Sequence, residues 1–215
     1  MSEEPVSADQ PSADQVSAES VSAEPVSVEP AGTVIGVCGF SAAGKTTFAA
    51  EMALRFRLPV LATGEVVRGR LIQRGEALTP EAIARVSDEI RQETGGRFVR
   101  VLAPQLARSL AGSPVVLVDC LREESDLLAL QELSYRVALV AVTAEESVRI
   151  ARAQGRAREG DPLTLDGFRS LDERERRLGV DRLVAGAEHQ LDNDGTLGDF
   201  VGRAAAVVNA ILAAG

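Results

Sequence analysis

The sequence predicts an α/β fold in which a parallel β-sheet lies between layers of helices, and two observations carry that prediction. Short apolar runs, such as Thr33–Cys38 and Val115–Val118, alternate along the chain with longer segments of helical spacing. A glycine-rich loop follows the first run directly and leads into a helical pattern through Phe48, Met52 and Phe56. Apolar runs without polar alternation are typical of strands buried on both faces, as in parallel sheets.

Composition limits the class of protein further. The chain has 215 residues, 45% of them hydrophobic, which suffices for one substantial core. No apolar run approaches the roughly 18 residues that a membrane-spanning helix needs. The N-terminus lacks the basic and apolar regions of a secretory signal, and two cysteines do not make a disulfide framework. We therefore expect a cytoplasmic protein without a membrane partner.

Residues 1–31 are expected to form a disordered acidic tail, separate from a folded domain over residues 32–215. Five-residue units such as P-S-A-D-Q and V-S-A-E-P repeat there, and such residues cannot bury enough surface to offset chain entropy. A docking peptide for a partner is the alternative. The first 30 residues hold seven acids and no base, so they account for −7 of the net charge of −9. The remaining −2 gives no basic face, and we expect no nucleic-acid partner.

The segment G-F-S-A-A-G-K-T-T, residues 39–47, matches the phosphate-binding pattern G-x-x-x-x-G-K-[ST] in its strand–loop–helix context. Glycines let backbone N–H groups face a phosphate without a Cβ in the way, and the following helix adds the positive end of its dipole. Lys45 would reach the β- and γ-phosphates, and the Thr46 hydroxyl would ligate Mg²⁺. The residues expected to bind ATP here are Gly39, Ser41, Ala42, Ala43, Gly44, Lys45, Thr46 and Thr47.

Lysine usage supports this interpretation. The chain contains 22 Arg and one Lys, and that lysine is Lys45. A compact ammonium suits a narrow ring of backbone groups, whereas the guanidinium of arginine is broad and planar. The alternative, a glycine-rich turn with a surface lysine, would not require lysine at this one position.

An apolar run ending in Asp119 predicts a metal ligand. Carboxyl ends of parallel strands meet at one edge of the sheet, so Asp119 should lie beside the phosphate loop, where a carboxylate can hold Mg²⁺ through water. The alternative is that Asp119 caps the next helix.

Several motifs together resemble the dephospho-coenzyme A kinase-related P-loop proteins known mainly from archaea, which are similar to adenylate and cytidylate kinases. The motifs are V-I-G-V-C-G (34–39), the phosphate loop, G-E-V-V-R (64–68), V-D-C-L-R (118–122), R-A-R-E-G-D-P (156–162) and N-D-G-T-L (193–197). The resemblance covers about residues 33–213. It implies a three-layer P-loop NTPase fold with a five-stranded parallel sheet of order 2-3-1-4-5. Cys120 departs from the glycine that is usual in the fourth motif, which leaves the shape of this turn open.

The resemblance also implies an acceptor site. Thr63, Glu65 and Arg68 match the element that binds the acceptor in nucleoside-monophosphate kinases, within an insertion over about residues 63–112. The alternative is an ordinary helix start with an acid in its first turn. Thr79 is expected to cap a helix that runs to about Thr94, and residues 97–110 are expected to form a second helix.

A lid over about residues 153–168 is implied too, with Arg156 and Arg158 neutralising charge on the transferring phosphoryl group. Arg149 and Arg152 fit a solvated helix face better, on a helix that a capping box at Thr143 would open. The residues expected to act in catalysis are Lys45, Asp119, Arg122, Arg156 and Arg158.

Asn193 and Gly195 match the loop that contacts adenine in dephospho-coenzyme A kinases. A turn followed by a helix capped by Thr196 satisfies the same residues.

These expectations describe an ATP- and Mg²⁺-dependent kinase, a monomer or homodimer, that phosphorylates a small nucleotide-like acceptor: a nucleoside monophosphate or a molecule like dephospho-coenzyme A. A regulatory P-loop ATPase without such an acceptor is the alternative, although it would not need the acceptor element or the lid arginines. Arg68 and Arg122 favour a phosphate acceptor. A hydroxyl acceptor would need a base, for which Glu65 and Asp119 are the candidates.

Overall fold

The computed structural model describes residues 32–133, 135–156, 162 and 164–214. The predicted tail at residues 1–31 and the predicted lid residue Arg158 lie outside these ranges. The strands are β1 (Thr33–Cys38), β2 (Val60–Ala62), β3 (Val115–Asp119), β4 (Arg136–Thr143) and β5 (His189–Asp192). The helices are α1 (Lys45–Phe56), α2 (Thr63–Gln73), α3 (Pro80–Glu93), the 3₁₀ helix η1 (Phe98–Leu102), α4 (Ala103–Gly112), α5 (Glu124–Glu132), α6 (Glu146–Arg156), α7 (Leu165–Leu178), α8 (Val180–Gly186) and α9 (Leu197–Ala213).

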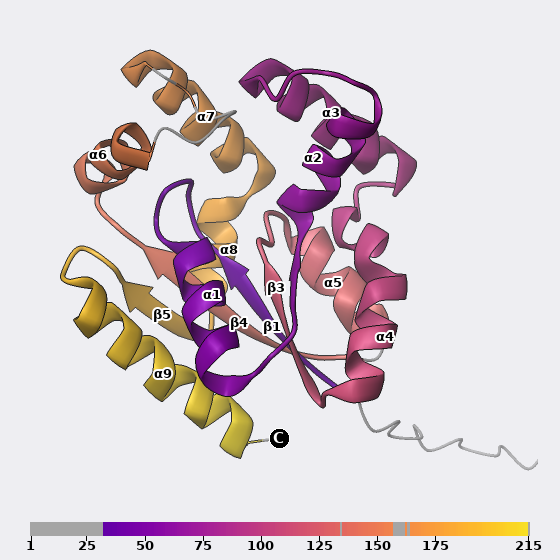
Figure 1. Cartoon of the computed structure of the whole chain (residues 1–215), viewed down its shortest axis with the longest axis vertical. Helices are drawn as coiled ribbons and strands as arrows, with labels where there is room; N and C mark the ends of the chain where they lie inside the picture. Colours follow the sequence, from indigo (N-terminus) through magenta and orange to yellow (C-terminus); the bar gives the residue numbers. More distant parts are fainter. Residues whose placement is uncertain (1–31, 134, 157–161, 163, 215) are drawn as a thin grey trace, which may run out of the picture.

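The five strands form one parallel sheet in the order β2-β3-β1-β4-β5, which confirms the predicted topology (Figure 1). From β1 the chain continues to β2 on one side of the sheet, and from β4 it continues to β5 on the other. A crevice therefore forms at the carboxyl ends of β1 and β4, which is where open α/β sheets bind ligands.

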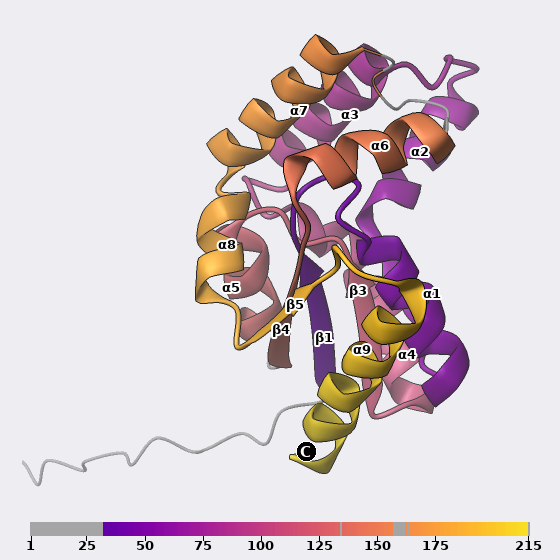
Figure 2. The same cartoon turned by 90° about the vertical axis from the view of Figure 1, so that its left-hand side faces the viewer.

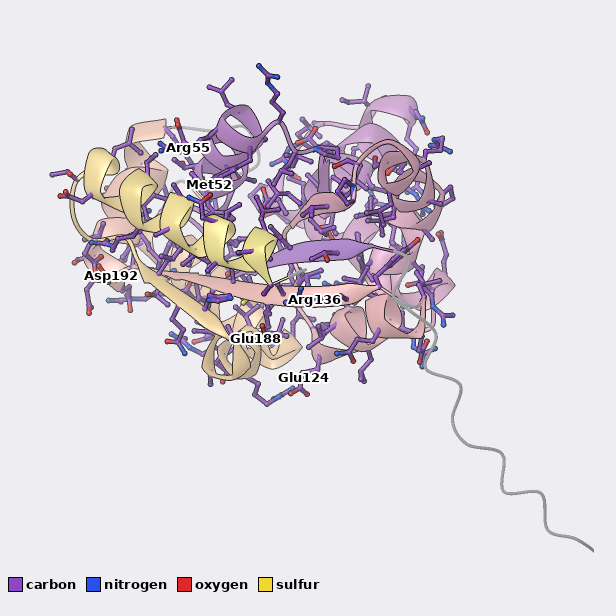
Figure 3. All side chains as sticks on the ribbon, turned by 90° about the horizontal axis from the view of Figure 1, so that it is seen from below. Met52, Arg55, Glu124, Arg136, Glu188 and Asp192 are labelled. Carbon is purple, nitrogen blue, oxygen red and sulfur yellow. The ribbon has the colours of Figure 1, made fainter. Side chains whose placement is uncertain are left out.

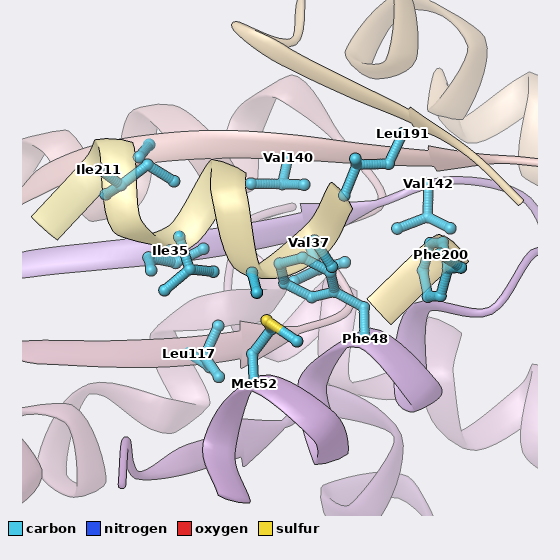
Figure 4. Close-up of a cluster of buried hydrophobic side chains, with 14 of the residues drawn as sticks. Ile35, Val37, Phe48, Met52, Leu117, Val140, Val142, Leu191, Phe200 and Ile211 are labelled. Carbon is cyan, nitrogen blue, oxygen red and sulfur yellow. The ribbon is translucent and has the colours of Figure 1, made fainter. Parts of the chain in front are cut away.

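Helices cover both faces of the sheet, because neighbouring residues of each strand point to opposite sides. Figure 2 shows α1 and α9 on one face and α5 and α8 on the other. In Figure 3, α9 lies on one side of the strands and Glu124, at the start of α5, on the opposite side. The first core contains Ile35, Val37, Phe48, Met52, Leu117, Val140, Val142 and Phe200 (Figure 4). The second contains Val34, Leu102, Leu106, Val116, Val118, Leu130, Leu139 and Leu183.

A third, smaller cluster belongs to α2, α3 and η1, beyond the carboxyl edge of the sheet (Figure 1). Its buried members are Val67, Leu71, Val86, Ile90 and Phe98. Thr79 caps α3 as predicted, since its side chain accepts from the Ala82 N–H. This helical pair forms one wall above the crevice, and α6 and α7 form the other.

Two local predictions were wrong. Residues 97–110 do not form one helix: η1 ends at Leu102 and α4 begins at Ala103. Pro104 has no N–H to donate to the carbonyl of Arg100, so a continuous α-helix is interrupted there.

The predicted capping box at Thr143 does not form either. Pairing with Asp192 keeps Thr143 in β4, and α6 begins only at Glu146. The Glu145 N–H instead donates to Asp194 Oδ1 at 2.8 Å, so the turn after β5 supplies the acceptor that the box would have provided.

Among the residues that the structure describes, no helix combines the length and apolarity needed to cross a membrane.

Met52→Ala should lower the free energy of unfolding by about 2–5 kcal/mol, because a fully buried side chain would leave a cavity between α1, the sheet and α9. Leu54→Ala is the matched control on the same helix. Leu54 is 81% exposed, so its loss should cost less than about 0.5 kcal/mol. Denaturant unfolding measures both, and equal effects of the two substitutions would contradict this packing of α1.

Candidate functional site

The phosphate loop connects the carboxyl end of β1 to the start of α1, and its two glycines cannot be replaced without strain. Gly39 has φ 137°, and a Cβ there would lie 2.2 Å from the carbonyl oxygen of Val142. Gly44 has φ 115°, and its Cβ would lie 2.2 Å from Asn193 Nδ2. Both positions combine a left-handed backbone with close approach of β4 or the β5 turn, which only glycine permits.

Lys45 lies inside the loop. It is the first residue of α1 and only 8% exposed, and its Nζ donates to the carbonyl oxygens of Gly39 and Phe40, each at 2.8 Å. The ammonium therefore lies within the curve of the backbone, beside the N-terminus of α1. A phosphate held by this loop would meet both the ammonium and the positive end of the helix dipole.

Thr46 and Asp119 lie beside each other, as predicted from the meeting of strand ends. The Thr46 hydroxyl donates to Asp119 Oδ2 at 2.9 Å, and Asp119 pairs in register with Val37 of β1. In the described part of the chain, Asp119 Oδ1 is buried without a hydrogen-bond partner. A buried carboxylate oxygen with an unused acceptor fits a site for a hard cation or its bound water.

No group of three or more His, Cys, Asp or Glu side chains suited to a metal occurs among the described residues. Thr46 and Asp119 would thus supply only part of a coordination shell. Mg²⁺ commonly takes its remaining ligands from phosphates and water, so the arrangement fits Mg²⁺ that arrives with a nucleotide.

A cavity of about 710 Å³ opens above the loop. Ser41, Ala42 and residues 44–47 border it from one side, and Asp119 and Arg122 from another. Arg152, Arg156, Asn193 and Leu197 close the side near β5 and α9. The volume is within the range of small-molecule and cofactor sites.

Asn193 supports the loop from this side. It is 6% exposed, its side-chain Nδ2 donates to Ala43 O at 2.7 Å, and its backbone carbonyl accepts from Arg152 Nη2 at 2.6 Å. Asn193 borders the cavity predicted to hold the nucleotide, but its Nδ2 is already bonded to the loop. Gly195 is exposed in the following turn, and Thr196 caps α9 as predicted by accepting from the Asp199 N–H.

Arg149 is not on a solvated face, contrary to the sequence interpretation. Its guanidinium forms a buried pair with Asp172 of α7, at 2.9 and 2.6 Å, and lies 5.3 Å from the ring centroids of Phe40 and Phe168. It also donates to Ser41 O at 3.2 Å. A side chain predicted as solvated thus connects α6, α7 and the phosphate loop. Arg152 is only partly buried, but it does not face solvent freely either, because it donates to the backbone carbonyl oxygens of Asn193 and Ala43.

A second cavity, of about 70 Å³, lies beneath α2 and α3. Three arginines contribute to its wall: Arg68, Arg91 and Arg122. Thr63 borders it as well, and the Thr63 hydroxyl donates to Cys120 O at 3.0 Å. The residues common to both cavities are Thr63, Gly64, Arg68, Cys120 and Arg122.

Glu65, the predicted acceptor ligand and candidate base, lies at the edge of the large cavity. Its side chain is 65% exposed, and Oε1 is 3.5 Å from Arg68 Nη1. The structure brings Thr63, Arg68 and Arg122 together and places Glu65 beside them. Of the two predicted lid arginines, Arg156 ends α6 and borders the large cavity, whereas Arg158 lies outside the described residues.

Sequence reasoning missed two buried carboxylates. Asp126 borders the small cavity and accepts from the backbone N–H groups of Val99 and Arg122. Burial raises the pKa of Asp126 to about 6, although these two N–H groups oppose the shift. Glu175 of α7 is fully buried and accepts from both the N–H and the hydroxyl of Ser41, at 2.8 and 2.9 Å.

Helical spacing contained a signal for Glu175. Phe168, Asp172 and Glu175 are separated by four and three residues, so they share one face of α7. Phe168, the apolar residue of the three, indicates that this face of α7 is buried.

The two cysteines at the strand ends are buried free thiols. Burial raises the pKa of Cys38 to about 12, and it also raises the pKa of Cys120. Both therefore remain protonated near neutral pH and are poor nucleophiles.

This geometry is that of a P-loop protein with a kinase-like fold. A family model described as an AAA domain matches residues 34–177. A UPF0200 protein from Thermococcus gammatolerans is 31% identical over 182 residues, covering 83% of this chain and 95% of that protein. The chain therefore belongs to the AAA-domain family of the matching model and to the UPF0200 proteins, which confirms the predicted likeness to an archaeal P-loop family.

Solved structures share the fold. A structure of a putative kinase from Chloroflexus aurantiacus aligns with a TM-score of 0.61 at 20% identity, covering 86% of this chain and 98% of that one. A gluconokinase from Sinorhizobium meliloti aligns with a TM-score of 0.54 at 21% identity, covering 85% and 94%. At this identity the likeness concerns the fold alone.

Arg149→Met should reduce the free energy of unfolding by about 3–5 kcal/mol, because it leaves Asp172 buried without its cation. The double variant Arg149→Met, Asp172→Leu removes both charges and should recover part of that loss. Chemical denaturation of the two single variants and the double variant gives the coupling energy. Additive losses would contradict a direct pairing of these side chains.

Proposed function

We propose that this protein is an ATP-dependent phosphotransferase that passes the γ-phosphoryl group to a small nucleotide-like acceptor. The observation that carries the proposal is the pair of adjoining cavities. One contains the phosphate loop, the other is bordered by Arg68, Arg91 and Arg122, and the two share Arg68 and Arg122 where they meet. The small cavity, of about 70 Å³, has room for a phosphate group and not for a whole nucleotide. A donor in the large cavity and an acceptor whose phosphate enters the small one would bring their reacting groups together at this junction.

On the donor side, the loop N–H groups and Lys45 would hold the β- and γ-phosphates. The base and ribose would extend toward the side of the cavity that is bordered by Arg152 and Arg156 of α6 and by Asn193 and Leu197. Mg²⁺ held by Thr46 and Asp119 would neutralise charge on the phosphate oxygens when it is bound.

On the acceptor side, the three arginines favour an acceptor that is already anionic. An ionised phosphate oxygen needs no base, and guanidinium groups bind phosphate in a bidentate manner. Asp126, the buried carboxylate of this cavity, has both oxygens engaged by backbone N–H groups. We therefore favour a nucleoside monophosphate or similar phosphate over a hydroxyl acceptor. A regulatory ATPase would not need this arginine-lined cavity.

In this proposal, residues from about 63 to 112 form the acceptor-binding insertion, and residues from about 153 to 168 form the lid. Arg156 borders the donor cavity from the start of that lid, and Arg158 would act with it. Such cations stabilise the charge that spreads over the transferring phosphoryl group.

The proposal is tested by ADP release from Mg²⁺ and ATP with a panel of nucleoside monophosphates, nucleosides and dephospho-coenzyme A. Lys45→Ala should lose at least about a hundredfold in turnover, because its ammonium acts on phosphate charge. Arg55→Ala, which removes an exposed cation from the same helix, should retain full turnover. Full turnover in folded Lys45→Ala, or no acceptor-dependent ADP release from wild type, would contradict the assignment.

Glu65→Gln distinguishes the two kinds of acceptor. With a phosphate acceptor, turnover should fall less than about tenfold, whereas loss of a general base typically costs about a hundredfold or more. Arg68→Ala serves as the comparison and should mainly raise the KM of the acceptor, because it removes a binding cation. A hundredfold loss in Glu65→Gln with an unchanged acceptor KM would instead indicate a hydroxyl acceptor.

A further inference from the structure

Glu175 of α7 lies against the tip of the phosphate loop. Its carboxylate is fully buried, and its two oxygens accept from the N–H and the hydroxyl of Ser41. Arg122 Nη1 is 3.5 Å from Oε1 of the same carboxylate. Glu175 thus connects the donor loop to the arginine that borders both cavities.

The surroundings of Glu175 are those of an anion site. Burial alone would raise the pKa of this carboxyl group, but Arg122, Lys45 and the donors of Ser41 outweigh it and hold the pKa below its usual value. The carboxylate is therefore negatively charged although it is fully buried. Loop N–H groups, Lys45 and an arginine are also what a γ-phosphoryl group requires.

The Glu175 carboxylate and a γ-phosphoryl group cannot both bind these donors without a large electrostatic penalty. Like charges a few ångströms apart repel strongly where water is excluded, and each loop N–H has one hydrogen to donate. We propose that in the nucleotide-free protein Glu175 engages two donors of the γ-phosphoryl subsite, Ser41 and Arg122, which border the large cavity. A bound γ-phosphoryl group would compete for these donors, displace Glu175 from Ser41 and release Arg122. This inference rests on the proposed nucleoside triphosphate donor.

Displacement of Glu175 would also affect the proposed acceptor cavity. Arg174, the neighbour of Glu175 in α7, donates to Ala84 O at 3.2 Å and to Asp88 Oδ1 at 2.5 Å, both in α3. Asp88 in turn pairs with Arg91, which borders the acceptor cavity. Movement of α7 at Glu175 would therefore be transmitted to a wall of the acceptor cavity, so that Glu175 couples donor binding to acceptor binding.

The test compares ATP with ADP, because only ATP carries the group that would displace Glu175. The Kd of each nucleotide is measured for the full chain by competition with a fluorescent ADP analogue, at a fixed Mg²⁺ concentration. Glu175→Gln keeps the size of the side chain and an acceptor for Ser41 but removes its charge. The ratio of the ADP Kd to the ATP Kd should increase at least about tenfold, with ADP affinity nearly unchanged.

Glu173→Gln is the matched control, since it removes the same charge from an exposed position of the same helix, and its ratio should equal that of wild type. An unchanged or lower ratio in folded Glu175→Gln overturns the inference. If wild type binds neither nucleotide, the proposed function fails first, and the inference with it.

Should Glu175→Gln fail to fold, hydrogen exchange in wild type decides the question. Peptides covering residues 168–178 should exchange faster with a non-hydrolysable ATP analogue than with ADP, because α7 loses its connection to the loop. Equal or slower exchange with the ATP analogue overturns the inference.

Discussion

The structure depends on how the carbonyl groups of the phosphate loop are satisfied. Gly39 O and Phe40 O accept from Lys45, Ser41 O accepts from Arg149, and Ala43 O accepts from Asn193. Each of these donors is a buried side chain. These contacts fix the path of the loop backbone, and a loop of this shape can offer N–H groups to a bound anion.

These donors come from three different parts of the chain, which explains the arrangement of the surrounding helices. Lys45 begins α1, Arg149 belongs to α6 and is fixed by Asp172 of α7, and Asn193 follows β5. The loop is therefore the point at which the sheet, the α6–α7 pair and the C-terminal helix meet. Arg122 provides the corresponding connection to the small cavity beneath α2 and α3, because it borders both cavities.

The features predicted from the sequence are those encoded locally. The loop pattern, the cap of α3 at Thr79 and the position of Asp119 at a strand end all follow from residues adjacent in the chain. The buried set of Arg149, Asp172 and Glu175 was not predicted, because charged residues on an amphipathic helix ordinarily face solvent. Helical spacing places Asp172 and Glu175 on the same face as Phe168, but the partners that hold them are more than 20 residues away. Pro104, by contrast, is a local signal. A proline inside the 97–110 segment already indicates that one continuous helix would be interrupted there.

The single lysine has a practical consequence for chemical labelling. Reagents that acylate side-chain amines meet one such group in the whole sequence, and that amine is almost completely buried within the loop. Its rate of modification therefore reports whether the loop is open, closed or filled, without any engineered probe. An affinity label with an amine-directed group in place of a terminal phosphate would, for the same reason, attach at one side chain only.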